Sequence, residues 1–468
     1  MRKLILTALV LALTGSAFAQ QRWQRTYGGT SYDAGMSVKQ TFDGGYIVVG
    51  NTSVMPWGYL YLVKVDSLGD TLWTRRYGTF GADGNCVQQT SDTGYIIVGD
   101  KGDYNLNPHV YLLKTNAQGD TLWTRTYGGS GSEFGWCVQQ TRDGGYIISG
   151  ETSSFGAGGE DVYLIKTDAH GDTLWTRTYG GIYDDYGGKS VQQTYDGGYI
   201  VAGATYSFGP GILNYPNVYL IKTNSQGDTV WTRWYGGDNW DEGWCVLQTP
   251  DSCYIVAGMT GSGGAGGGDV YLIKTDAQGD TLWTKTYGGT QREDGHFVQQ
   301  TRDGGFILTG DTWSYGAGNE DVYLVKTNAQ GDTLWSKTFG GVNDDEGWCV
   351  QQTQDSGYIV TGYTKSFGAG LTDVYLIKTD ANGPSGVEKG SELKGKLPEL
   401  GFKVEPNPFV SFTRVPGHEA ERLSLYDISG RKVGVYKGDR IGSGLSAGVY
   451  FLKLEGQDAK PVRIVKLR

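Results

Sequence analysis

Short apolar runs separated by turn residues make up most of the chain between residues 20 and 383. Each run is rich in Val, Ile, Tyr, Thr or Trp and is bounded by turn residues, which is the pattern of β-strands. One complete unit contains four such runs, at residues 135–141, 146–150, 161–168 and 172–179. Asp143-Gly144, between the first two runs, supplies the positive-φ positions of a tight hairpin turn. The unit is therefore predicted to be four antiparallel strands.

This unit recurs along the chain, and its ends indicate how the copies are arranged. The fourth strand carries a tryptophan that returns every 50 to 56 residues, at Trp23, Trp73, Trp123, Trp175, Trp231, Trp283 and Trp335. Residues 22–28 form a fourth strand with no first three before it, and the last unit, 347–380, lacks a fourth. The two fragments complete each other in a ring, whereas a linear stack would need polar caps. The sequence predicts an all-β fold, a seven-bladed β-propeller over residues 20–383 whose N-terminal strand closes the last blade.

The run that joins the third and fourth strands, Tyr-Leu-Ile-Lys-Thr-Asp followed by Gly-Asp-Thr-Leu-Trp, resembles a known repeat. It is similar to the tryptophan-docking repeat of the pyrroloquinoline-quinone-type (quinoprotein-like) propellers, and the resemblance covers nearly all of residues 20–383. The turn from Asp168 to Gly171 is one residue shorter than in that family. The resemblance implies the ring but not the quinone chemistry, so no cofactor is predicted from it.

Composition and charge limit the partners of this ring. The chain contains 77 Gly and 60 aromatic residues among 468, which suits tight turns and a large buried core. Residues 20–383 carry 23 basic and 40 acidic side chains, a net charge of −17. Such a body repels nucleic acid. Four of the five cysteines, Cys86, Cys137, Cys245 and Cys349, recur at one place in the repeat, where we expect free, buried thiols too far apart for disulfides.

The two ends of the chain predict its destination. Residues 1–19 have the pattern of a secretory signal peptide, with Arg2 and Lys3 before an apolar run and a small-residue cleavage site at Ala17–Ala19. The apolar run is too short for a permanent transmembrane segment. Residues 384–400 are a polar linker that contains Gly and Pro. The mature protein is therefore expected to be exported, either secreted or held at the cell surface.

Residues 401–468 depart from the repeat. They resemble the C-terminal sorting domain of type IX secretion substrates, a small Ig-like β-sandwich. This resemblance implies that the secretion machinery is a partner, and that the domain is removed after passage across the outer membrane. An ordinary accessory sandwich is the alternative. The matching residues are Pro406, Asn407, Pro408, Tyr426, Gly430, Gly448, Tyr450 and Lys466.

Acidic residues in the loops suggest a ligand-binding site. The loop from each fourth strand to the next first strand carries acid, and it should share a face of the ring with the variable loops between second and third strands. A carboxylate crown with nearby aromatics could hold Ca²⁺, a glycan or a basic protein segment, or each acid could cap its own turn or pair with a repeated Lys or Arg. The candidate ligand-binding residues are Asp33, Asp83, Glu133, Asp184, Asp185, Asp241, Glu242, Glu293, Asp294, Asp345, Glu346, Trp313 and Tyr315.

Catalysis is the competing hypothesis. The four His are dispersed, and no His/Cys cluster has the spacing of a metal site. A propeller hydrolase or lyase, or a quinone-dependent dehydrogenase, would use asymmetric residues around the central channel, and the fourth repeat, with Asp184-Asp185-Tyr186, is the most asymmetric. A purely structural surface protein is a third alternative. The near-identity of the repeats favours a non-enzymatic binding protein with no predicted catalytic residue.

Overall fold

The structure is a computed structural model. It describes residues 22–54, 57–78, 81–102, 107–210 and 214–383, and in the C-terminal part residues 415, 422–427, 431–437, 441, 445–454 and 462–466. The chain divides into two compact units, Met1–Val387 and Glu388–Arg468. The predicted signal peptide, the linker and Pro406, Asn407, Pro408 and Gly430 of the predicted sorting domain lie outside the described residues.

All regular elements of the described residues are β-strands, and no helix there is long and apolar enough to span a membrane. The strands of the first unit are β1 (Trp23–Tyr27), β2 (Asp33–Gln40), β3 (Tyr46–Val54), β4 (Trp57–Val65), β5 (Thr71–Tyr77), β6 (Cys86–Gln89), β7 (Tyr95–Lys101), β8 (His109–Thr115), β9 (Thr121–Tyr127), β10 (Glu133–Gln140), β11 (Tyr146–Thr152), β12 (Asp161–Thr167), β13 (Thr173–Tyr179), β14 (Asp185–Gln193), β15 (Tyr199–Thr205), β16 (Asn217–Thr223), β17 (Thr229–Tyr235), β18 (Asp241–Gln248), β19 (Tyr254–Thr260), β20 (Asp269–Thr275), β21 (Thr281–Tyr287), β22 (Glu293–Gln300), β23 (Phe306–Thr312), β24 (Asp321–Thr327), β25 (Thr333–Phe339), β26 (Asp345–Gln352), β27 (Tyr358–Thr364) and β28 (Asp373–Thr379). Those of the second unit are β29 (Arg422–Asp427), β30 (Lys432–Lys437), β31 (Gly448–Leu454) and β32 (Val462–Lys466).

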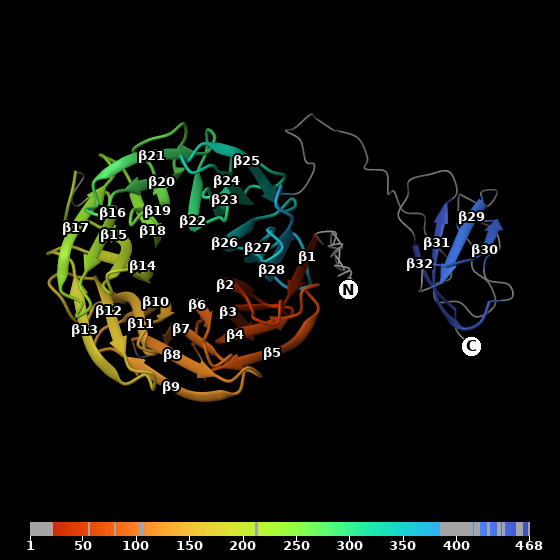
Figure 1. The fold of residues 1–468 in the computed structure, drawn as a ribbon, viewed down its shortest axis with the longest axis horizontal. Helices are drawn as coiled ribbons and strands as arrows, with labels where there is room; N and C mark the ends of the chain where they lie inside the picture. The colour runs from red at the N-terminus through yellow and green to blue at the C-terminus, as the bar shows by residue number, and fades with distance from the viewer. Residues whose placement is uncertain are drawn as a thin grey trace, which may run out of the picture. The chain divides into compact units, whose positions relative to one another are not determined.

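The strands of the first unit form seven four-stranded antiparallel sheets arranged as the blades of a β-propeller (Figure 1). We number the blades 1 to 7 from β2, so that blade 1 is β2-β3-β4-β5. The last sheet has the order β1-β28-β27-β26. In it, β1 pairs with β28 from Trp23 opposite Lys378 to Tyr27 opposite Val374. The predicted closure of the ring by the N-terminal strand is confirmed.

Each blade docks on the next through the tryptophan of its outermost strand. Trp23 of β1 lies edge-on to Tyr46 in blade 1, with ring centroids 5.9 Å apart, and the Tyr27 hydroxyl donates to the Gly69 carbonyl at 2.7 Å. Gly69 has φ +81°, and a Cβ there would lie 2.9 Å from the Trp23 ring, so only glycine fits. The same aromatic contact recurs at all seven blade junctions, as Trp73–Tyr95, Trp123–Tyr146, Trp175–Tyr199, Trp231–Tyr254, Trp283–Phe306 and Trp335–Tyr358.

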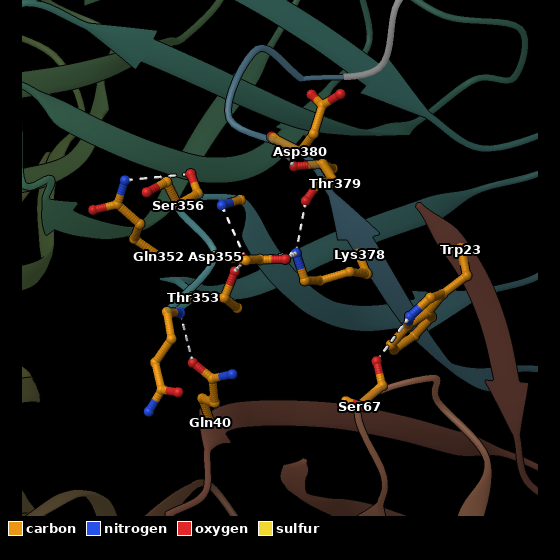
Figure 2. A network of polar contacts seen from close by, with 12 residues as sticks. Trp23, Gln40, Ser67, Gln352, Thr353, Asp355, Ser356, Lys378, Thr379 and Asp380 are labelled. Carbon is orange, nitrogen blue, oxygen red and sulfur yellow. Dashed lines mark hydrogen bonds and ion pairs between the residues drawn. The ribbon is translucent and has the colours of Figure 1, made fainter. Parts of the chain in front are cut away.

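A lysine supports the first turn of every blade, and it is buried in all of them except blade 5, where Lys274 is half-buried. Figure 2 shows this in blade 7, where Lys378 Nζ donates to Asp355 at 2.8 Å and to the Thr379 carbonyl at 2.9 Å. The repeated Lys therefore pair with acids of the short turns after the first strands, and the repeated Arg pair with acids of the next blade's short turn. This corrects the alternative in which they pair with the acidic crown. The lysine pairs are Lys64–Asp43, Lys114–Asp92, Lys166–Asp143, Lys222–Asp196, Lys274–Asp251, Lys326–Asp303 and Lys378–Asp355.

The described residues of the second unit form one antiparallel sheet of order β30-β29-β31-β32. Leu423, Leu425 and Leu452 are buried on it together with Val415 and Ile441. An all-β C-terminal unit agrees with the sequence, and its Ig-like sandwich form stays a prediction.

Candidate functional site

The two sets of loops that carry the predicted site share one face of the ring, which we call the loop face. In blade 3, the Ser153 amide after the second strand donates to the Ser132 carbonyl before the first strand at 2.8 Å. In blade 6, the Trp313 amide donates to the Arg292 carbonyl at 3.0 Å. The predicted acids therefore do gather on one face, but they divide into groups with different surroundings.

In every blade except blade 2, the acid that begins the first strand is buried and caps its own turn. Asp185, for example, accepts hydrogen bonds from the Gly181 amide at 2.5 Å and from the Ser207 hydroxyl at 2.6 Å. In each case the amide four residues earlier donates to the carboxylate, which is the turn-capping role that the sequence left as the alternative, and we leave these acids out of the site below. They are Asp33, Glu133, Asp185, Asp241, Glu293 and Asp345.

The acid one residue further along faces the central channel. Glu242 accepts from the Trp244 indole at 2.7 Å and from the Tyr186 hydroxyl at 2.6 Å. Asp294 pairs across the sheet with Asp311 of the second strand. Further carboxyl groups join from the second strands and one loop. We call the set the channel mouth: Asp83, Asp100, Glu151, Glu242, Asp294, Asp311, Glu320 and Glu346.

Three other predicted residues lie away from the channel mouth or at its rim. Asp184 is exposed and accepts from the Glu160 amide at 3.1 Å. Tyr315 packs on Tyr323 and donates its hydroxyl to the Gly288 carbonyl at 2.8 Å. Trp313 is 46% exposed, and its side chain hydrogen-bonds to Glu320. Of the three, only Trp313 contacts the channel mouth.

Beside the channel mouth is a ring of side chains contributed one per blade. In blade 3 the ladder between β10 and β11 shifts register between Gly135 and Cys137, and Trp136 is the extra residue. Such a bulge turns its side chain out of the regular alternation. The equivalent residues line a cavity of about 270 Å³. They are Met36, Asn85, Trp136, Lys189, Trp244, His296 and Trp348.

His296 is stacked between two of these tryptophans. Its ring centroid is 4.4 Å from that of Trp244 and 4.2 Å from that of Trp348. Its Nε2 lies 2.5 Å from Asp311 Oδ1, and the side chain is only 7% exposed. Burial lowers the pKa of His296 to about 4, so the imidazole is neutral at pH 7. Its other nitrogen, Nδ1, is buried and has no hydrogen-bond partner among the described residues. The site thus presents an oriented, neutral imidazole with one nitrogen available.

Several carboxyl groups of the channel mouth hold their protons more tightly than usual. Burial raises the pKa of Asp100, Glu151 and Glu320 to about 7 each, with neighbouring carboxyl groups adding to the effect. Burial and Asp294 also raise the pKa of Asp311 well above its usual range. Buried acids of this kind resist ionisation until a positive charge is near.

Positive charge in this region is limited. Arg292 contacts Asp294 at 2.9 Å, and Lys189 Nζ lies 4.6 Å from the centre of the Trp244 ring. Asp294 Oδ1 is buried without a hydrogen-bond partner in the described part of the chain, whereas the Asp311 side chain shares a hydrogen bond with that of Glu320. No three His, Cys, Asp or Glu side chains of the described residues converge as a metal cage. The Ca²⁺ that the sequence left possible therefore finds no group of three such side chains among them.

The residues that sequence reasoning missed occupy a repeated position. Blades 3, 5 and 7 carry Gly-Trp-Cys-Val in the first strand, whereas blade 6 has Gly-His296-Phe297-Val and blade 4 has Lys189-Ser190. The sequence-based prediction points to the fourth repeat through Asp184-Asp185-Tyr186, not through Lys189, and does not distinguish blade 6. Aligning the first strands would have shown both departures.

No family model matches the chain, and no curated protein matches it. Several solved structures have a similar fold. One is PorZ of Porphyromonas gingivalis, described as an essential bacterial surface component of the type-IX secretion system, at 10% identity and a TM-score of 0.44, with 94% of this chain and 60% of that chain covered. Another is the extracellular domain of a hybrid two-component system from B. thetaiotaomicron, at 10% identity and a TM-score of 0.42, with 95% and 57% covered.

A third similar structure is the Pan2 WD40 domain of Neurospora crassa, at 8% identity and a TM-score of 0.46, with 75% of this chain and 90% of that chain covered. The chain matches 60% and 57% of the lengths of the first two proteins. Likeness at this level describes the fold alone.

Proposed function

We propose that this protein is an exported, non-enzymatic β-propeller that binds a ligand carrying a protonated amine or guanidinium group at the channel mouth. The observation that carries the proposal is that acids interact in two groups, Asp83, Asp100 and Glu151 in blades 2 and 3 and Asp294, Asp311, Glu320 and Glu346 in blades 6 and 7, with the pKa values of Asp100, Glu151 and Glu320 raised to about 7. A cation that enters replaces their protons and lets them ionise. The unpartnered Asp294 Oδ1 supplies an acceptor for its N–H groups.

The aromatic ring beside these acids also suits a cation. Lys189 Nζ lies over the faces of Trp244 and Trp136, at 4.6 Å and 5.8 Å from the ring centres, so an ammonium group is already accommodated there by cation–π attraction. A ligand ammonium between the carboxylates and the indoles would gain charge-assisted hydrogen bonds as well.

A neutral glycan fits less well than a cation. Sugars bind proteins largely by stacking on free aromatic faces, but His296 occupies one face of Trp244 and one of Trp348. Lys189 lies over Trp136. The exposed ring of Trp313 at the rim is a small platform by comparison. We therefore favour an amine over a sugar, and glycan binding is an outcome that the experiment distinguishes.

The binding experiment uses the full chain and spermidine as a simple polyamine probe, with affinity measured by calorimetry at about pH 7.5 and low salt. Glu320→Gln and Asp311→Asn remove acids of the channel mouth. Asp172→Asn neutralises a carboxylate on an exposed turn away from the channel mouth, where Asp172 pairs with Arg125. We expect about tenfold weaker binding or worse for the first two variants and unchanged binding for the third.

Two results would overturn the proposal. One is an unmodified protein that does not bind spermidine or lysine oligomers. The other is an equal loss of affinity in all three variants, which would mean that only net charge matters. Binding of neutral oligosaccharides without amine binding would assign the site to glycans instead.

The route of delivery is also a proposal. The likeness of residues 401–468 to type IX sorting domains supports passage across the outer membrane, and the C-terminal residues belong to a separate compact unit. Tyr426, Gly448, Tyr450 and Lys466 lie in strands of its sheet. Deleting residues 401–468 should leave the propeller in the periplasm of its host. Normal export of the truncated chain would reject this route.

A further inference from the structure

A second ring of side chains lies one residue beyond the ring of Trp136 and His296, again one per blade. Its members are thiols or hydroxyls except in blade 6, and each points toward the next blade. Cys245 Sγ contacts the Val298 carbonyl at 3.5 Å, and Ser190 Oγ contacts the Val246 carbonyl at 3.3 Å. The ring consists of Ser37, Cys86, Cys137, Ser190, Cys245, Phe297 and Cys349.

This direction brings two cysteines together wherever consecutive blades both carry one. That occurs between blades 2 and 3, where the Sγ atoms of Cys86 and Cys137 are 4.0 Å apart. Cys245 and Cys349 are separated by Phe297 of blade 6. All five thiols are free, as the sequence predicted, but the expected wide separation does not extend to the sulfur atoms of this pair.

The pair is also more accessible than the other two cysteines of the ring. Cys86 and Cys137 are partly exposed and line the cavity. Cys245 and Cys349, at 3% and 1% exposure, are buried. The contact between the two sulfurs lowers the pKa of Cys86 and raises that of Cys137. One thiol of the pair is thus the better nucleophile and the other lies beside it, which is the arrangement that favours disulfide formation.

We propose that Cys86 and Cys137 are a redox-active dithiol that oxidises to a disulfide between blades 2 and 3. Each thiol loses one proton and one electron, and an S–S bond forms. A diazene or disulfide oxidant takes up the two electrons and two protons and is reduced to a hydrazine or to two thiols. The sulfurs move from 4.0 Å to about 2 Å apart. The bond ties the two blades together in the wall of the cavity, next to Trp136.

The test treats the full chain with diamide and titrates free thiols after denaturation. A Cys253→Ser background removes the one cysteine outside the ring, so that four thiols remain. We expect two of these four to disappear in a protein that stays monomeric. Peptide mapping should find the Cys86 and Cys137 peptides joined and two hydrogen atoms lighter. The melting temperature should rise on oxidation and return on reduction.

Serine variants provide the controls, because Ser37 and Ser190 already occupy this position in other blades. Cys86→Ser and Cys137→Ser should each abolish the thiol loss, and either one suffices if the other does not fold. Cys245→Ser should still lose two thiols. Four unreacted thiols in the background protein, or a cross-link that maps to another pair or to a second molecule, would overturn the proposal.

Discussion

Closure of the ring makes a sharp prediction about two tryptophans. Trp23 of β1 and Trp73 of β5 occupy the same place in the repeat, and each lies edge-on to a tyrosine of the next blade, at 5.9 Å and 6.1 Å. Trp73 belongs to β5, which directly follows the other three strands of its blade in sequence. Trp23 belongs to β1, whose partner strand, β28, is the last strand of the propeller in sequence. Replacing each by alanine therefore compares a local junction with the closing junction.

The structure sets the size of the effect. A fully buried tryptophan replaced by alanine costs about 3–5 kcal/mol, and Trp23 and Trp73 are half-buried. Each loses its aromatic pair, worth about 0.5–1.5 kcal/mol, and its packing on a turn glycine, Gly69 or Gly119. Trp23 also loses the bond from its indole N–H to the Ser67 carbonyl at 3.3 Å (Figure 2). We expect Trp23→Ala and Trp73→Ala each to lower the free energy of unfolding by about 2–3 kcal/mol.

The assay is urea unfolding followed by circular dichroism, with both variants and the unmodified chain measured side by side. Equal losses mean that the closing junction is as well formed as an internal one. A Trp23→Ala variant with the stability of the unmodified chain, beside a destabilised Trp73→Ala, would show that β1 is not part of the ring and would refute the architecture.

Three further predictions concern stability. Carboxyl groups whose pKa is raised in the folded state stabilise the fold below their unfolded pKa and lose that contribution as pH rises through the folded pKa. The melting temperature should therefore fall between about pH 5 and about pH 8. Glu151→Gln removes one such group and should make the melting temperature depend less on pH. A steeper dependence on pH in that variant would contradict the assignment. Lys166→Met, which removes a lysine that is 4% exposed, should cost about 1–3 kcal/mol in urea unfolding, whereas Arg125→Met at the outer rim should cost under about 1 kcal/mol. Phe339 stands where the other junctions have a tyrosine whose hydroxyl bonds to a turn glycine. Phe339→Tyr should therefore raise the free energy of unfolding by about 1 kcal/mol. An unchanged free energy of unfolding in a urea titration would show that the new hydroxyl finds no acceptor.

The strands, the turns and the closed ring could all be predicted because local chemistry repeats in each blade. Asp143-Gly144 forms the turn between first and second strands, and Gly144 has φ +84°; the Asp-Gly pairs at the same place in blades 1, 4 and 6 likewise have a positive φ at Gly44, Gly197 and Gly304. The unpaired fourth strand at residues 22–28 had one partner left, in the last blade. Each repeat thus predicts the same four strands and turns from its own residues.

The site could be predicted only in part, because it depends on which of two neighbouring residues faces the channel. Asp241 and Glu242 are both buried acids at the start of β18, yet Asp241 caps a turn and Glu242 bonds to Trp244. Alternation along a strand predicts opposite sides for the two but not which side is the channel. The bulge after Gly243 then changes the alternation.

The side-chain contacts between neighbouring strands and neighbouring blades around the channel could not be predicted from the sequence either. Asp311 reaches His296 from the neighbouring strand of the same sheet, and Cys86 reaches Cys137 from another blade. Such contacts depend on how closely the inner strands converge, which repeat spacing does not specify.

The central claim is that several carboxyl groups of the channel mouth are protonated in the ligand-free protein and release their protons to solvent when a cation binds. Calorimetry of spermidine binding in buffers of different ionisation enthalpy measures this directly. The account predicts net proton release on binding at about pH 7, together with an affinity that rises from about pH 5 to about pH 8. Binding with no proton exchange, or with proton uptake, would contradict it.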